Sequence, residues 1–222
     1  MSINRRKLLI NSAASIGAGI SGASIFGSLP SFGATGDVYD IKKLNAPDGP
    51  ADHILGDPDS KVSVIEYASS TCGFCARFHT DVYPEFKKAY IDTNKIKFTL
   101  RPFILNVLDA VVFMVAYKAG ETSSDAYYAV LDAYLKNQTT WSQAQDPRSE
   151  ILKIAKQFGF SDKSFDAVLS NKELFEGMER LREQASKKFD MSGTPSFYIN
   201  GKQFVGIQTF ETLAEEIDKQ LS

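Results

Sequence analysis

The feature that most constrains this chain is a pair of cysteines, Cys72 and Cys75, placed where a strand-like segment gives way to a helix-like one. Residues 62–68 are β-branched and mostly apolar, which predicts a central strand buried on both faces. The Ser-Ser-Thr that follows favours a turn and a helix cap. From residue 72 to residue 90 apolar side chains recur at every fourth position, which predicts a helix that Pro84 should kink.

A cysteine at a helix N-terminus has a chemical role. Unpaired amide groups and the helix dipole favour an anion there, so they lower the pKa of the Cys72 thiol and produce the reactive thiolate. Cys75 lies one turn further along, more buried and close enough to form a disulfide. We therefore predict that Cys72 attacks and Cys75 resolves, through a mixed disulfide. The redox-active Cys72–Cys75 disulfide needs no separate cofactor.

Two other interpretations of the cysteine pair stay open. Half of a metal site would need about two more ligands, and the chain offers only His53 and His79 besides the cysteines. Two inert core cysteines are the second alternative, but a C-x-x-C between a strand and a helix is the redox arrangement. We predict no metal site.

The remaining pattern predicts the architecture. Residues 95–101 alternate polar and apolar side chains, as a half-exposed strand does. Asn200-Gly201 is a strong hairpin signal between two short strand-like runs, and residues 209–221 form an amphipathic helix. Helical patterns without a strand signal fill the interval between, at residues 107–119, 126–135, 147–158, 163–169 and 172–189. This order predicts an α/β fold with a mixed central sheet and a helical insertion at about residues 104–190.

A proline directly precedes the second pair of strands, in Gly193-Thr194-Pro195. A proline there cannot continue a strand ladder, so it marks a strand start or a cis turn. Taken alone, the motif is equally compatible with an ordinary loop proline in the trans form.

These segments resemble the DsbA family. Residues 66–79, which contain both cysteines, look like that family's active-site segment. Residues 193–197, followed by Asn200-Gly201, look like its cis-proline segment and hairpin. The resemblance spans about residues 51–221 and implies a thioredoxin fold that oxidises newly exported proteins.

The resemblance also implies roles for single residues. Thr194 matches the residue whose backbone pairs with bound substrate. Pro195, which follows it, and Phe74, whose ring we expect to be exposed, are the other predicted substrate-binding residues. Glu66, six residues before Cys72, matches the buried acid that moves the proton of the resolving cysteine. Its apolar neighbours favour burial over a position on an exposed strand edge, and a buried acid can accept that proton.

One departure from the family's best-known member concerns the residues between the cysteines, which are Pro-His there and Gly73-Phe74 here. That histidine helps to stabilise the thiolate, whereas a phenylalanine side chain has no hydrogen bond to donate. We therefore expect the helix amides and the Thr194 hydroxyl to stabilise the thiolate. We also expect a weaker oxidant than a Pro-His protein, because oxidising strength follows the stability of the reduced form.

The N-terminus predicts an export signal at residues 1–34. A basic start, an uncharged stretch at residues 8–26 and a small-residue end follow the secretory order, and Arg5-Arg6 resembles a twin-arginine signal. A retained membrane anchor is the alternative, because the uncharged stretch is just long enough to cross a bilayer. Residues 35–60 predict an extended lead-in and residues 61–222 the DsbA-type domain, so the expected location is the periplasm.

The formal net charge of −2 gives no reason to expect a nucleic-acid partner. The resemblance implies unfolded or newly exported cysteine-containing proteins as substrates, a DsbB-type membrane protein as reoxidant, and a monomer. A disulfide isomerase or reductase is an alternative, although the lead-in is too short for the dimerisation domain of related isomerases. A peptide-binding chaperone is another, but it would not need a dithiol.

Overall fold

The computed structural model describes residues 35–222 of the chain. The expected export signal at residues 1–34 lies outside the described residues and stays a prediction. Among residues 35–222, no helix combines the length and the apolar character that crossing a bilayer requires.

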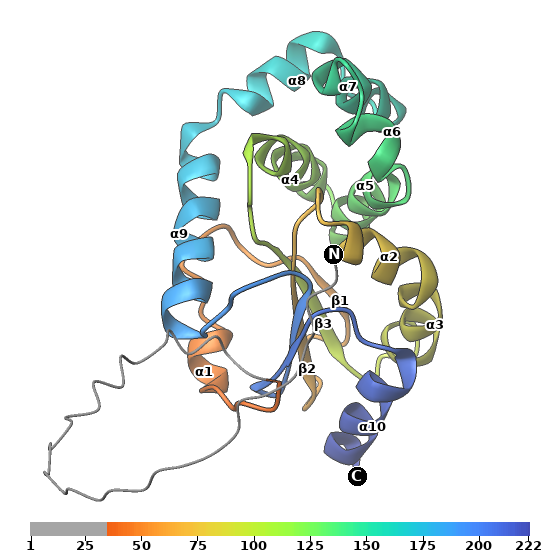
Figure 1. Cartoon of the computed structure of the whole chain (residues 1–222), viewed down its shortest axis with the longest axis vertical. Coiled ribbons are helices and arrows are strands. Elements are labelled where there is room, and N and C mark those ends of the chain that lie inside the picture. Colours follow the sequence, from red (N-terminus) through yellow and green to blue (C-terminus); the bar gives the residue numbers. More distant parts are fainter. Residues whose placement is uncertain (1–34) are drawn as a thin grey trace, which may run out of the picture. The chain divides into compact units, whose positions relative to one another are not determined.

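A five-stranded sheet forms the centre of the described domain, with the strands in the order β1-β3-β2-β4-β5 (Figure 1). The bounds are β1 (Ile54–Gly56), β2 (Ser63–Ala68), β3 (Lys97–Pro102), β4 (Ser196–Ile199) and β5 (Lys202–Val205). β2 and β3 run parallel and every other pair is antiparallel. β2 lies in the middle with all its residues buried, so the predicted mixed sheet with a buried central strand is confirmed.

The connection from β2 to β3 is helical but broken. Instead of one kinked helix over residues 72–90, the chain forms α2 (Gly73–Asp81), α3 (Tyr83–Phe86) and a π-helical turn, η1 (Lys87–Ile91). Pro84 lies in the first turn of α3, where its missing N–H leaves no carbonyl without a partner. The break therefore falls just before the proline rather than at it.

The predicted helical insertion lies between β3 and β4. It consists of α4 (Val107–Gly120), α5 (Ser124–Lys136), α6 (Gln138–Ser142), α7 (Pro147–Gln157), α8 (Asp162–Leu169) and α9 (Lys172–Lys188). The sequence pattern did not predict α6, which is too short to show a period. Helices α4 to α8 gather beyond one end of the sheet, and α9 returns along it (Figure 1). The C-terminal helix α10 (Phe210–Leu221) closes the domain.

The two faces of β2 belong to different cores. Val64 and Ala68 pack into the large cluster that holds α2, α4 and α5. Ile65 and Tyr67 pack on the other face, against α9 and the short helix α1 (Ile41–Leu44). Because side chains alternate along a strand, Glu66 lies on the same face as Val64 and Ala68, the face that α2 covers.

The lead-in at residues 35–60 is more structured than its extended pattern suggested, because it contributes α1 and the edge strand β1. Its anchor is an ion pair. Two guanidinium nitrogens of Arg101, Nε and Nη2, donate to the Asp52 carboxylate, at 2.8 and 2.6 Å. Arg101 is fully buried and also donates to the Leu44 carbonyl and the Tyr67 hydroxyl. This residue of β3 therefore fastens the lead-in to the sheet.

Breaking this pair should destabilise the protein. We expect Asp52→Ala to lower the free energy of unfolding by about 3 kcal/mol, because it leaves a buried guanidinium without its carboxylate. Asp132→Ala, which removes a surface pair with Lys136, is the matched control and should cost less than about 1 kcal/mol. Urea denaturation measures both, and equal losses would contradict the anchoring role.

Candidate active site

The two cysteines occupy different environments at the start of α2. Cys72 is the N-cap residue of the helix, with an extended backbone and a half-buried side chain. Cys75 lies one turn into the helix and is 0% exposed. Both are free thiols, and the Cys75 thiol is close enough to hydrogen-bond the Cys72 sulfur. This division matches the predicted attacking and resolving thiols.

The environment of Cys72 favours its thiolate strongly. The hydrogen bond from the Cys75 thiol is the largest cause of a pKa lowered from 9.0 to about 5. The Thr194 side chain and the backbone amides of Cys75 and Phe74 lower it further, against the opposing effect of burial. The amides and Thr194 are the groups expected from the sequence, whereas the larger contribution of the second thiol was not predicted.

The pKa of Cys75 shifts in the opposite direction to that of Cys72. Desolvation raises its pKa well above 9.0, and the charges of Cys72 and Glu66 raise it further. One thiol of the pair is therefore ionised near neutral pH while the other keeps its proton. This asymmetry fits the predicted roles of Cys72 as the attacking thiolate and of Cys75 as its protonated partner.

The segment before β4 lies directly beside Cys72. The Thr194–Pro195 peptide bond is cis, and the Cys72 Sγ lies 3.2 Å from the Thr194 carbonyl oxygen. Antiparallel pairing of Tyr67 with Ser196 holds this segment against the end of β2. Residues far apart in sequence thus meet at the sulfur, with a backbone edge next to it.

Glu66 lies beneath the cysteines rather than on a strand edge. Its side chain is 0% exposed, and both carboxylate oxygens contact His79 Nε2, at 3.1 and 3.0 Å. His79 lies four residues after Cys75 on the same face of α2. From the sequence His79 was a candidate only for a metal ligand, whereas the structure pairs it with the buried acid.

A second buried carboxylate, Asp109 of α4, was not foreseen. It is 0% exposed and accepts hydrogen bonds from the whole turn before Cys72. The donors are the Ser69 and Ser70 hydroxyls, the Thr71 amide and the Leu105 amide, all within 3.0 Å. The only sequence signal for it was a single acid in the otherwise apolar start of a helix.

Gln138 of α6 holds the same turn from another side. Its amide nitrogen donates to the carbonyl oxygens of Ser70, at 2.7 Å, and Cys72, at 2.9 Å. No pattern in the sequence could mark this residue, because its partners lie more than sixty positions away. Asp109 and Gln138 together show that the helical insertion fixes the position of the first cysteine.

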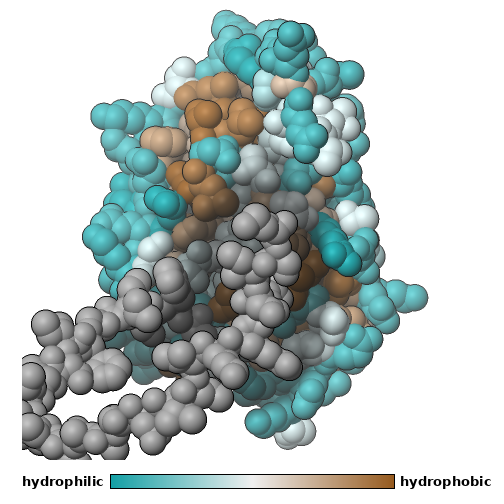
Figure 2. All heavy atoms as spheres, in the orientation of Figure 1, coloured by the Kyte–Doolittle hydropathy of each residue, from teal (hydrophilic) through white to brown (hydrophobic). Residues whose placement is uncertain are grey.

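Exposed apolar side chains lie on two segments close to the reactive sulfur in the fold. Phe74 is 60% exposed, Leu105 52% and Val107 70%. Asn106, between the latter two, donates a 2.8 Å hydrogen bond to the Thr71 hydroxyl, which brings this loop next to Cys72. Apolar atoms are also visible over the inserted helices on the face seen in Figure 2. Three exposed apolar side chains on neighbouring segments are suited to contact with an apolar polypeptide.

Known proteins share this arrangement over most of the described chain. The thioredoxin family model matches residues 48–219. A putative protein-disulfide oxidoreductase of Rickettsia bellii is 33% identical over 170 residues, which cover 77% of this chain and 64% of the relative. The chain therefore spans less than two thirds of that relative's length.

Two further comparisons agree. Disulfide bond formation protein D of Bacillus subtilis is 21% identical over 173 residues, or 76% of each chain. The crystal structure of Wolbachia pipientis alpha-DsbA1 matches with a TM-score of 0.73 and 25% identity, over 81% of this chain and 95% of that one. The predicted thioredoxin fold is thereby confirmed.

The low pKa of Cys72 should make the stability of the reduced protein depend on pH. The pKa is about 5 in the folded chain and 9.0 when unperturbed. The resulting stabilisation is complete above pH 9 and is lost as the pH falls through about 5. Cys75 keeps its proton throughout this window, since its pKa lies higher.

We therefore expect the free energy of unfolding of the reduced protein, relative to that of the oxidised protein, to rise steadily as the pH increases from about 5 to 9.0. Urea denaturation of both forms at several pH values measures the difference. A difference that does not change with pH would show that Cys72 is not activated.

Proposed function

Because the chain belongs to the DsbA family of thioredoxin-like thiol:disulfide oxidoreductases, we propose that it is a dithiol oxidase that introduces disulfides into exported proteins. Cys72 and Cys75 carry the reaction. The observation that carries the proposal is the contrast between a Cys72 pKa of about 5 and a Cys75 pKa well above 9.0. A stable thiolate favours the reduced form, which makes the disulfide form an oxidant.

The reaction follows from the positions of the two sulfurs. A substrate thiolate attacks Cys72, the more accessible sulfur, and the bond to Cys75 breaks. Cys75 leaves as a thiolate and takes up a proton, while the substrate is held as a mixed disulfide on Cys72. A second substrate thiolate then attacks the substrate sulfur, and Cys72 leaves as its stable thiolate. Two electrons pass from the substrate dithiol to the protein.

The surface around Cys72 fits an unfolded substrate. An extended chain can pair with the backbone edge at Thr194 beside Pro195, in the manner of an added strand. The exposed Phe74 ring then contacts residues next to the substrate cysteine. Newly exported cysteine-containing proteins present such segments before they fold, so the proposed location of the enzyme is the periplasm. The proposed functional unit is a monomer. A DsbB-type membrane protein would accept the electrons and restore the disulfide.

Oxidation of a reduced peptide with two cysteines tests the proposal. We expect the oxidised protein to form one peptide disulfide per molecule, and Cys72→Ser to form none. Cys75→Ser should form none either, because it has no disulfide to give up. Offered an oxidised peptide instead, its Cys72 thiolate should open the peptide disulfide and stay joined to it as a mixed disulfide, because no Cys75 is present to attack that bond. Equilibration with glutathione should give a reduction potential above the roughly −180 mV of an isomerase. A potential near the roughly −270 mV of thioredoxin would instead identify a reductase.

The dipeptide between the cysteines tests what sets the potential. Replacing Gly73-Phe74 by Pro-His adds a side-chain donor near Cys72, so the Cys72 pKa should fall further and the potential should rise. A change of one pKa unit corresponds to roughly 30 mV in a two-electron couple. Thiolate absorbance and glutathione equilibration measure the two quantities.

Phe74→Ala is the matched control for this exchange. Phe74 acts on Cys72 through its backbone amide, so removal of the ring should leave the Cys72 pKa unchanged. If the Pro-His protein shows neither a lower pKa nor a higher potential, the dipeptide does not control oxidising strength in this chain.

A further inference from the structure

Gln138 of α6 is bonded directly to the backbone of the reactive cysteine. Its Nε2 donates to the Ser70 carbonyl oxygen, at 2.7 Å, and to the Cys72 carbonyl oxygen, at 2.9 Å. Both partners can only accept, so the amide nitrogen rather than the amide oxygen must face them. One neutral side chain, with both of its N–H groups in use, therefore spans the residue that precedes the nucleophile.

The turn between β2 and α2 depends on these two hydrogen bonds. Ser70 is 1% exposed, and no other donor within residues 35–222 bonds to its carbonyl oxygen. The Cys72 carbonyl oxygen also accepts the Ala76 amide, at 3.1 Å, as the first hydrogen bond of α2. Gln138 thus satisfies a buried carbonyl group and adds a second bond at the carbonyl where the helix begins.

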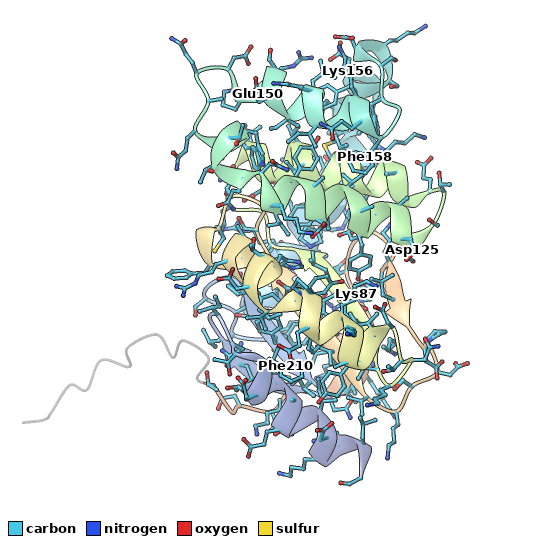
Figure 3. The ribbon with its side chains drawn as sticks, turned by 90° about the vertical axis from the view of Figure 1, so that its right-hand side faces the viewer. Lys87, Asp125, Glu150, Lys156, Phe158 and Phe210 are labelled. Atoms are coloured by element: carbon cyan, nitrogen blue, oxygen red, sulfur yellow. The ribbon has the colours of Figure 1, made fainter. Side chains whose placement is uncertain are left out.

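The helix that carries Gln138 is itself firmly held. Trp141 of α6 is fully buried, and its Nε1 donates to the Tyr134 carbonyl oxygen of α5, at 2.8 Å. Figure 3 shows α5, marked near its start by Asp125, lying alongside the helical segment that runs from α2 to Lys87. Because α6 follows α5 directly and packs on it, Gln138 reaches the turn from a fixed support.

The side chain of Cys72 does little to fix its own conformation. A serine or aspartate at an N-cap commonly does so by accepting a hydrogen bond from a helix amide. A thiol sulfur is only a weak acceptor, and Cys72 makes no side-chain capping bond with α2. Its backbone nevertheless holds the extended N-cap conformation, with φ −79° and ψ 117°. The hydrogen bonds to the neighbouring carbonyl groups therefore carry the task of holding Cys72 at the helix start.

The orientation of Cys72 decides how well its thiolate is stabilised. The stabilising groups are the Cys75 thiol, the Thr194 side chain and the backbone amides of Cys75 and Phe74. They act through hydrogen bonds, which weaken steeply when donor and acceptor are misaligned. Gln138 carries no net charge, so the alignment of the sulfur with these groups is its means of influence.

We propose that Gln138 is a positioning residue for the disulfide reaction, which holds the Ser70 and Cys72 carbonyls and thereby sets the oxidising strength of the cysteine pair. The alignment stabilises the reduced form, because only there is Cys72 a thiolate. In the disulfide form the sulfur has no charge to stabilise. Loss of the alignment therefore favours the disulfide form and gives a weaker oxidant. The inference rests on the proposed oxidase function.

Gln138→Met is the first test, because methionine has a similar length but no hydrogen to donate. We expect the pKa of Cys72 to rise by about one unit and the equilibrium with glutathione to shift about 10-fold toward the disulfide form of the protein. That shift corresponds to a reduction potential lower by roughly 30 mV. Thiolate absorbance as a function of pH and equilibration with glutathione at neutral pH measure the two quantities.

Gln184→Met is the matched control. Gln184 of α9 is 7% exposed, against 8% for Gln138. It also joins two backbone groups, because it donates to the Ala46 carbonyl oxygen at 2.9 Å and accepts the Asp48 amide at 3.0 Å. These partners belong to the lead-in. Both variants should lose stability in urea denaturation, because each leaves backbone groups without a partner. Only Gln138→Met should change the Cys72 pKa and the potential.

Gln138→Asn is a milder second variant, which carries the test if the methionine variant does not fold. Its amide is attached by one methylene fewer, so it cannot keep both hydrogen bonds at their present lengths. We expect the Cys72 pKa and the glutathione equilibrium to shift in the same direction as in Gln138→Met, by a smaller amount.

The outcomes separate the inference from the proposed function. If the Gln138 variants leave the Cys72 pKa and the glutathione equilibrium unchanged, Gln138 is merely structural, the inference is overturned and the oxidase function stands. Equal shifts in Gln184→Met would also overturn it, because the effect would then come from lost stability. A parent protein that does not oxidise thiols removes the oxidase function itself.

Discussion

The hydrogen bonds that the turn before Cys72 gives to the buried Asp109 carboxylate are the constraint on which the rest of the site depends. Two hydroxyls and two backbone amides converge on this one fully buried side chain. Hydrogen bonds to a charged acceptor are among the stronger ones in proteins. They fix the turn between β2 and α2, and so they place Cys72 at the helix start. Asp109 belongs to α4, so the inserted helices hold the catalytic turn as well as covering the sheet.

That placement explains why two cysteines in one helical turn behave so differently. Cys72 caps the helix, where amides and the neighbouring thiol stabilise its anion. Cys75 points into the core beside Glu66, where burial keeps it protonated. Each state supports the other, because only a protonated Cys75 can donate to the Cys72 thiolate. The contrast between the two thiols is therefore a property of the fold around the turn, and neither cysteine has it alone.

Sequence patterns predicted those strands, turns and helices that depend on contacts between residues close together in the sequence. The buried strand, the hairpin at Asn200-Gly201 and most inserted helices follow from periodicity and capping residues within a few positions. The sequence pattern did not predict β1, because a strand of three residues between prolines is too short to show a period. Asp109, Gln138 and the pairing of Glu66 with His79 depend on contacts across the tertiary structure. Their side chains look like ordinary surface or helix residues until the fold brings them together, so no single-sequence argument could assign them.

The activation of Cys72 does not depend on the side chain at position 74, which leaves that position available for the proposed contact with substrate. The pKa of Cys72 is already about 5 although Phe74 offers sulfur only its backbone amide. The stabilising groups are the second thiol, the helix amides and Thr194, and all of them remain whatever the side chain at position 74 is. The aromatic ring is 60% exposed, and Leu105 and Val107 are exposed as well. A family position used elsewhere to stabilise the thiolate here adds apolar surface, because the rest of the turn already provides the electrostatics.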